Sequence, residues 1–68
     1  MIYKVGDMVE YIYERNRLFE GRIVKVRGIF KKRYIIAGEY KYWNNNTVQY
    51  ARGVVEIPHS NIIKKLEE

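Results

Sequence analysis

The chain has 68 residues, no cysteine and a formal net charge of +5 at pH 7. A chain of this length forms one domain, and the lack of cysteine excludes disulfides, thiolate metal sites and a thiol nucleophile. Hydrophobic residues make up 47% of the sequence, so residues 1–68 are predicted to be a single compact domain and not a disordered tail. No apolar run approaches the roughly 18–20 residues of a membrane span, and residues 1–4 do not begin a signal peptide. A soluble, intracellular protein without a membrane partner is therefore expected.

The positive charge is concentrated between residues 15 and 33. This segment has eight basic side chains against one acid, Glu20, whereas the rest of the chain has five basic and seven acidic side chains. Such a concentration favours an acidic partner, DNA or RNA. The alternative is a charged face that only keeps the protein in solution. The eight candidates for phosphate contacts are Arg15, Arg17, Arg22, Lys25, Arg27, Lys31, Lys32 and Arg33.

Alternating apolar and polar residues, separated by turn residues, predict five strands. At the centre, residues 22–36 contain two apolar runs around a basic segment, which predicts two antiparallel strands joined by a basic tip. Gly21 is expected to be a bulge or bend point, and residues 58–61 a short helical turn. The fold class is therefore all-β, and at this length a small barrel is the economical architecture. The expected strands cover residues 8–14, 18–27, 33–43, 47–57 and 62–66.

The segment 33–57 has the pattern of a long hairpin. Residues 44–46 are three asparagines, which tolerate the left-handed backbone angles of a tight turn. Gly38 and Gly53 lie at comparable distances on either side of this turn, so the hairpin is expected to bend there. Its outer half is then predicted to project from the domain.

The order and spacing of these segments resemble the SH3-like barrels of the Tudor, chromo-barrel and KOW type. The resemblance runs from Val5 to Leu66 and implies a five-stranded barrel with an extended hairpin between its third and fourth strands. It is carried by Val5-Gly6-Asp7-Met8-Val9, Leu18-Phe19-Glu20-Gly21-Arg22-Ile23-Val24-Lys25-Val26, Tyr34-Ile35-Ile36 and Val54-Val55-Glu56-Ile57-Pro58-His59-Ser60-Asn61-Ile62.

Tudor-type members form a cage of aromatic side chains where the first and third interstrand loops meet. The matching positions here are Tyr13, Phe19 and Tyr40, whereas a fourth position falls on Ala37 and leaves the cage incomplete. The segment 41–52 resembles an insertion relative to short Tudor domains, and its Tyr42 or Trp43 is a candidate to replace the missing wall. KOW-type members instead use basic side chains and loops of the same barrel to bind RNA or ribosomal partners. Arg15 and Arg17 would lie beside the cage, which argues against a methylated-lysine pocket and favours single-stranded nucleic acid.

Four aromatic residues flank the asparagine turn, on a hairpin too thin to bury all of them. Exposed rings of this kind stack on nucleobases, hold a cation over their face or contact a protein. Alternatively, they pair with one another and stabilise the hairpin. With Tyr13 and Phe19, the candidates for an aromatic surface are Tyr13, Phe19, Tyr40, Tyr42, Trp43 and Tyr50.

Catalytic and metal-binding patterns are not apparent in the sequence. His59 is the only histidine, and its neighbour Ser60 is too close along the chain to face it in a catalytic arrangement. There is no glycine-rich phosphate loop. We therefore expect no enzyme activity, no metal and no cofactor.

These patterns predict a non-enzymatic nucleic-acid-binding barrel with low sequence specificity, found in the cytoplasm, or in the nucleoid or nucleus if bound to nucleic acid. The basic residues would contact phosphates, and the aromatic residues would offer stacking surfaces. Two alternatives remain at this point. One is a Tudor-like protein-interaction module or a small subunit of a larger assembly, and the other is a homodimer joined through the edge of the long hairpin.

Overall fold

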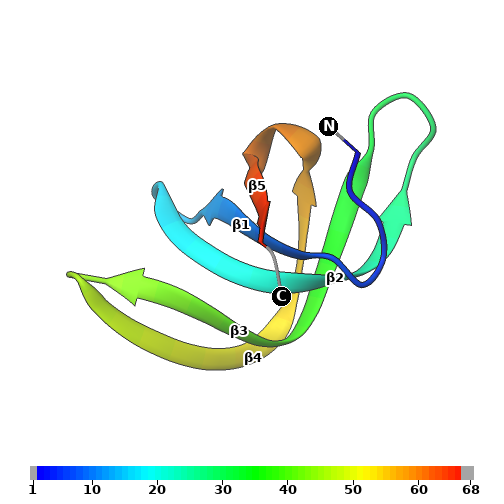
Figure 1. Cartoon of the computed structure of the whole chain (residues 1–68). Coiled ribbons are helices and arrows are strands. Elements are labelled where there is room, and N and C mark those ends of the chain that lie inside the picture. Colours follow the sequence, from blue (N-terminus) through cyan, green and yellow to red (C-terminus); the bar gives the residue numbers. More distant parts are fainter. Residues whose placement is uncertain (1, 67–68) are drawn as a thin grey trace.

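The structure, a computed structural model, describes residues 2–66. Each predicted strand is confirmed, with ends that differ by no more than one residue, and the helical turn follows the fourth strand as expected (Figure 1). The predicted domain of residues 1–68 also includes Met1, Glu67 and Glu68, which lie outside the described residues. The elements are β1 (Met8–Tyr13), β2 (Arg17–Arg27), β3 (Arg33–Asn44), β4 (Thr47–Pro58), η1 (His59–Asn61) and β5 (Ile62–Leu66).

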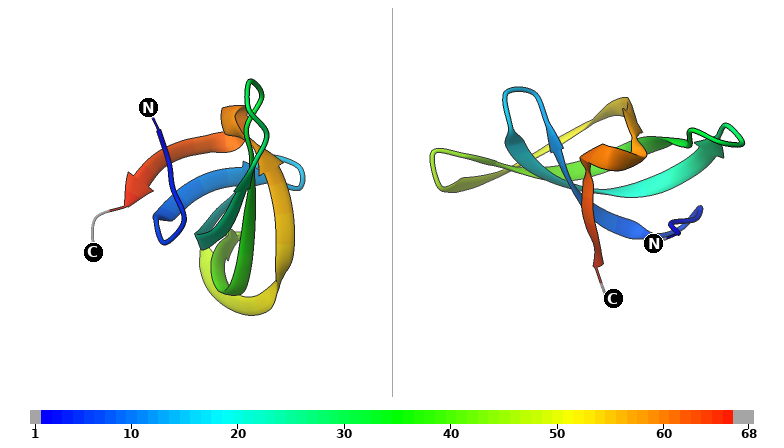
Figure 2. Two further views of the ribbon diagram at one scale, coloured as in Figure 1. Left: turned by 90° about the vertical axis from the view of Figure 1, so that its right-hand side faces the viewer. Right: turned by 90° about the horizontal axis from the view of Figure 1, so that it is seen from above.

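The five strands form one antiparallel sheet in the order β4-β3-β2-β1-β5. The sheet is strongly bent, as the end-on view in Figure 2 shows. Within residues 2–66, β4 and β5 do not pair with each other, so the sheet is open between its two edge strands. The all-β fold class is thus confirmed, while closure of the sheet into a barrel is not seen.

The core consists of nine buried hydrophobic side chains. Strand periodicity explains most of them, since alternate residues of a strand point to the same face. Two of them, Tyr11 and Tyr34, are at most 1% exposed, and burial raises the pKa of each phenol above its ordinary value of 10.0. The nine are Tyr3, Val9, Tyr11, Phe19, Ile23, Tyr34, Ile36, Ile57 and Ile62.

Gly21 lies opposite Val9 in the β1–β2 ladder and faces this core. A Cβ atom at Gly21 would lie 2.5 Å from Cγ2 of Ile36 and 3.5 Å from the Tyr11 ring. The β2–β3 register does shift next to it, as the expected bulge requires. The glycine is needed, however, because Ile36 and Tyr11 leave no room for a side chain.

The long hairpin of β3 and β4 bends where the sequence predicts. Gly38 and Gly53 are direct partners across the ladder, and Gly38 has a φ of +99°, which favours glycine. The hairpin is closed by Asn45 and Asn46, whose φ angles of 54° and 65° are both left-handed. This is the backbone of the two-residue turns that match the twist of antiparallel strands.

The predicted projection of the outer half of this hairpin is wrong in part. Tyr42 and Lys41 of β3 pair with Phe19 and Glu20 at the start of β2. Pairing therefore holds β3 against the sheet almost to its turn. This pairing is possible because β2 is long enough to reach both halves of β3. The prediction missed it because the pattern within one hairpin does not show which other strand lies beside it.

The N-terminal turn is tied to two strands through Asp7, which is 6% exposed. Its carboxylate accepts a hydrogen bond from the Lys4 N–H at 2.9 Å and lies 3.4 Å from Nζ of Lys65 on β5. Its backbone carbonyl accepts the Ile23 N–H of β2 at 2.9 Å. The hydrogen bond from Lys4, helped by the charge of Lys65, holds the pKa of Asp7 below its ordinary value of 3.8.

The loops gather at two opposite ends of the molecule (Figures 1 and 2). The loop between β2 and β3, residues 28–32, lies at one end, and we call it the tip loop. The β1–β2 loop, residues 14–16, and the turn at residues 45–46 lie at the other end. Surfaces built on these two ends are therefore separate.

Candidate functional site

The eight basic residues predicted to bind phosphates do not form one continuous patch. Lys31 and Lys32 are in the tip loop, with Arg27 and Arg33 at the strand ends beside it, whereas Arg15 and Arg17 lie at the opposite end. Arg22 and Lys25 lie between the two ends, along β2. A ligand at the tip loop would thus meet about half of the predicted set.

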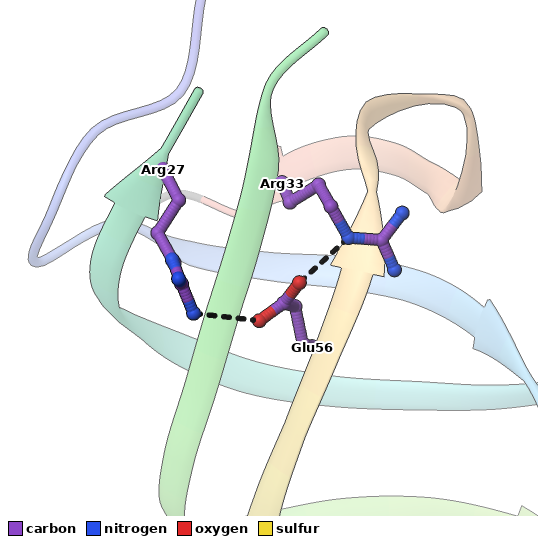
Figure 3. Close-up of polar contacts among 3 residues, drawn as sticks. All are labelled: Arg27, Arg33 and Glu56. Atoms are coloured by element: carbon purple, nitrogen blue, oxygen red, sulfur yellow. Dashed lines mark hydrogen bonds and ion pairs between the residues drawn. The ribbon is translucent and has the colours of Figure 1, made fainter.

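Arg27 and Arg33 already face a carboxylate, that of Glu56 on β4 (Figure 3). Nε of Arg33 donates to Oε2 of Glu56 at 2.7 Å, and Nη1 of Arg27 lies 3.5 Å from Oε1. All three side chains are at least one-third exposed, and such pairs contribute only about 0–1 kcal/mol each. The contacts are weak enough to be exchanged, but they lower the local positive charge.

Two further arginines have structural contacts. Nη1 of Arg22 donates a 2.7 Å hydrogen bond to the Gly6 carbonyl and so holds the N-terminal turn against β2. The guanidinium of Arg17 lies over the Tyr42 ring, 6.0 Å from its centre. These side chains are positioned by the protein itself, whatever else they contact.

Lys31 and Lys32 differ from these arginines. Both are exposed, and within residues 2–66 neither forms an ion pair or a side-chain hydrogen bond. Arg15 and Lys25 are exposed in the same way but lie away from the tip loop. The two lysines are therefore the cations most available at that end of the molecule.

Two apolar residues stand beside these lysines. Ile29 is 84% exposed and Phe30 is 98% exposed. The sequence pattern predicts a basic tip here, and neither residue is among the predicted site residues. The pattern that could have identified them is an aromatic residue among basic ones in a short loop, where no core can cover it.

Phe30 and both lysines line a groove of about 690 Å³ between the tip loop and η1, which we call the tip groove. The buried Tyr34 contributes to it, and its hydroxyl lies 3.2 Å from Nδ1 of His59 on the η1 side. The backbone N–H of His59 also donates to the Lys32 carbonyl at 3.3 Å, which ties the two sides together. The residues that line the tip groove are Ile2, Phe30, Lys31, Lys32, Arg33, Tyr34, Pro58, His59 and Ser60.

The predicted cage residues Tyr13, Phe19 and Tyr40 meet in a smaller pocket of about 140 Å³ at the opposite end, the aromatic pocket. Phe19 is only 5% exposed and contacts four other rings, so its expected role as a stacking surface does not fit its burial. Its ring instead supports the others. Glu14 also lines the aromatic pocket; this acid precedes Arg15 in the β1–β2 loop and is not among the predicted site residues. The pocket is completed by Tyr11, Gly53, Val54 and Val55.

The predicted replacements for the missing cage wall do not line this pocket. Tyr42 stacks on Phe19 with ring centres 5.5 Å apart, and Trp43 lies under Nζ of Lys41 at 5.4 Å from its ring centre. Tyr40 and Tyr42 both contact Phe19 and so attach the hairpin to β2. Their own ring centres are 6.0 Å apart, as in the alternative of mutual pairing. Tyr50, on β4, is 65% exposed.

In the part of the chain that the structure describes, no group of three or more acidic or histidine side chains could hold a metal ion. None of the helices in this part is both long enough and apolar enough to cross a membrane. A scan against protein-family models, a search of curated proteins and a search of solved structures each found no match to this chain.

Proposed function

We propose that this chain is a non-enzymatic nucleic-acid-binding module of the SH3-like, Tudor or KOW type, with low sequence specificity. The observation that carries the proposal is the tip loop, where Lys31 and Lys32, which form no ion pair among residues 2–66, stand beside the exposed ring of Phe30. Lysines contact phosphates as point charges, and exposed rings stack on any base. Both contacts are insensitive to sequence.

The basic residues would contribute unequally to binding. Lys31 and Lys32 contact phosphates first, because no acid competes for them among residues 2–66. Arg27 and Arg33 join only when phosphate displaces Glu56, an exchange that weak exposed ion pairs permit. Arg15 and Arg17 lie too far away to share the same short stretch of phosphates.

Fluorescence anisotropy with single-stranded DNA, RNA and duplex DNA, at about 50 and 200 mM salt, tests the proposal. The Lys31→Ala/Lys32→Ala variant should bind more weakly, and the slope of log affinity against log salt should shrink by about 1.4 for a single strand. The control is Arg52→Ala/Lys64→Ala, which removes the same charge from exposed positions on β4 and β5. No binding of any of the three nucleic acids at about 50 mM salt would refute the proposal.

A Tudor-like protein-interaction module is the second candidate, favoured by the presence of Glu14 in the aromatic pocket. Tyrosine faces and a carboxylate together suit a cationic side chain of a partner protein. NMR titration with tetramethylammonium should then shift resonances of Tyr13 and Tyr40, and Glu14→Gln should weaken the effect. Shifts confined to the tip loop would count against this candidate.

A homodimer would use the free edge of β4, which pairs only with β3 in the described sheet. Val48, Tyr50 and Val54 are exposed on this strand, and an unpaired edge of this kind invites strand addition. Sedimentation velocity distinguishes the 8.2 kDa monomer from a dimer.

A further inference from the structure

Phe30 is the most exposed large hydrophobic side chain in the described residues, at 98%. Single exposed apolar residues are common on protein surfaces and need no explanation by themselves. Phe30 differs because it forms part of a concave site: its ring lines the tip groove, whereas its neighbour Ile29 does not. The exposed face of the ring is therefore available to a ligand that enters the groove.

The backbone on the two sides of the tip groove is tied together. Gly28 has a φ of +90°, and a Cβ atom there would clash with the Lys31 carbonyl oxygen, so the loop turns back tightly on itself. The hydrogen bond from the His59 N–H to the Lys32 carbonyl then joins the loop to η1. A preformed site loses less conformational entropy when a ligand binds.

The lining of the groove combines two chemistries. Phe30, Tyr34 and Pro58 offer apolar and aromatic surface, while Lys31, Lys32 and Arg33 offer positive charge. No acidic side chain lines it among the described residues. Charge complementarity therefore selects a ligand that has a flat apolar part joined to anionic groups, which is the chemistry of a nucleotide.

The concave shape also selects between forms of nucleic acid. In a duplex the faces of the bases are covered by their neighbours, so a ring beside a groove has no free base face to stack on unless two base pairs are first separated. In a single strand the bases can be splayed out and stacked on aromatic side chains. We propose that the tip groove binds an unpaired base of single-stranded DNA or RNA, with Phe30 stacked on the base and Lys31 and Lys32 on its flanking phosphates. This inference rests on the proposed function and names its ligand.

The test uses the full chain and an oligothymidine of about 12 nucleotides, with a duplex of equal length as the second probe. Phe30→Ala should weaken binding of the single strand by about 5- to 150-fold, the equivalent of about 1–3 kcal/mol per stacked base. The salt slope should not change, because no charge is removed. Ile29→Ala is the matched control, since it truncates another highly exposed residue next to Phe30 but outside the groove, and it should alter affinity by less than about twofold.

Binding of the duplex should be weaker than that of the single strand and insensitive to Phe30→Ala. Equal losses in Phe30→Ala and Ile29→Ala, or an equal loss for duplex and single strand, would overturn the inference and favour insertion of the loop as a wedge between base pairs. If both probes bind with a salt slope that depends on Lys31 and Lys32 but Phe30→Ala has no effect, the proposed function stands and the inference fails.

Absence of binding to both probes would instead refute the proposed function itself.

A further experiment tests a lipid surface, the other anionic partner that a basic and apolar loop could bind. Vesicles of phosphatidylcholine with phosphatidylserine should not sediment the protein. Sedimentation that is lost in both Phe30→Ala and Ile29→Ala, without binding of oligonucleotide, would assign the tip loop to membranes and overturn the inference.

Discussion

Gly21 is the residue at which the core leaves least space. Gly21→Ala should destabilise the fold by about 1–3 kcal/mol, because the new methyl group forces Ile36 and the Tyr11 ring out of their packed positions. Urea unfolding followed by tryptophan fluorescence measures this change. The matched control is Gly53→Ala, where the added atom would lie 3.5 Å from the Tyr40 ring, an ordinary contact. Equal losses in the two variants would show that the cost is not one of space.

Asp7 should make the free energy of unfolding depend on pH in the acidic range. Its pKa is lower in the folded protein than its ordinary value of 3.8, so its carboxylate stabilises the fold above that pH. This contribution disappears as the pH falls through the lowered pKa. Asp7→Asn should therefore unfold at lower urea concentration than the parent at pH 7, and the two midpoints should converge towards pH 2. Midpoints that stay the same distance apart over this range would contradict this role.

Phe19 shows what the sequence could not predict at this scale. Its position at the start of a strand matches an aromatic cage, and its neighbours Arg17 and Leu18 do not indicate burial. It is buried because β3 bends at Gly38 and brings Tyr40 and Tyr42 onto it. A contact of this kind depends on the path of another strand, which no local pattern encodes.

At the scale of elements, the turn at residues 45–46 sets the register of the longest ladder in the sheet. Replacement of both asparagines by alanine should cost about 1–2 kcal/mol, because alanine resists left-handed angles more than asparagine does. Asn46→Gly keeps the turn and serves as the control, since an Asn-Gly pair is preferred in such turns. Thermal unfolding followed by circular dichroism compares the two. A larger loss in the glycine variant would contradict this account of the turn.

Strand limits were predictable because alternation, turn asparagines and glycines are local patterns. The Gly38–Gly53 bend was predictable for the same reason, since the turn fixes which residues face each other. The ion pairs of Glu56 were not predicted, because this residue lies 23 positions from Arg33 along the chain. Once the β3–β4 register is known, Glu56 becomes a diagonal neighbour of Arg33, within reach of a long side chain.

At the scale of the whole molecule, the carboxylate of Glu56 lowers the positive charge beside the tip loop, where the proposed site lies. Glu56→Gln should release Arg27 and Arg33 for phosphates, so the salt slope for single strands should steepen by up to about 1.4. Stability should change by no more than about 1 kcal/mol, since both pairs are exposed. Anisotropy and urea unfolding provide the two measurements.

Glu39→Gln is the control for this change, because it removes the same charge from an exposed position on the outer half of β3. If the two variants bind nucleic acid equally, only net charge matters and Glu56 has no local effect.

The pairing of β5 with β1 has a consequence for how fast the molecule folds. It joins residues that lie between 51 and 58 positions apart, from Tyr11 with Ile62 to Met8 with Leu66. The entropy of closing so long a loop is lost before these contacts can stabilise anything. Refolding is therefore expected on the order of milliseconds to seconds, the range of sheets rich in distant contacts. The three hairpins, β1–β2, β2–β3 and β3–β4, can form early from neighbouring residues, and the addition of the last strand then sets the rate.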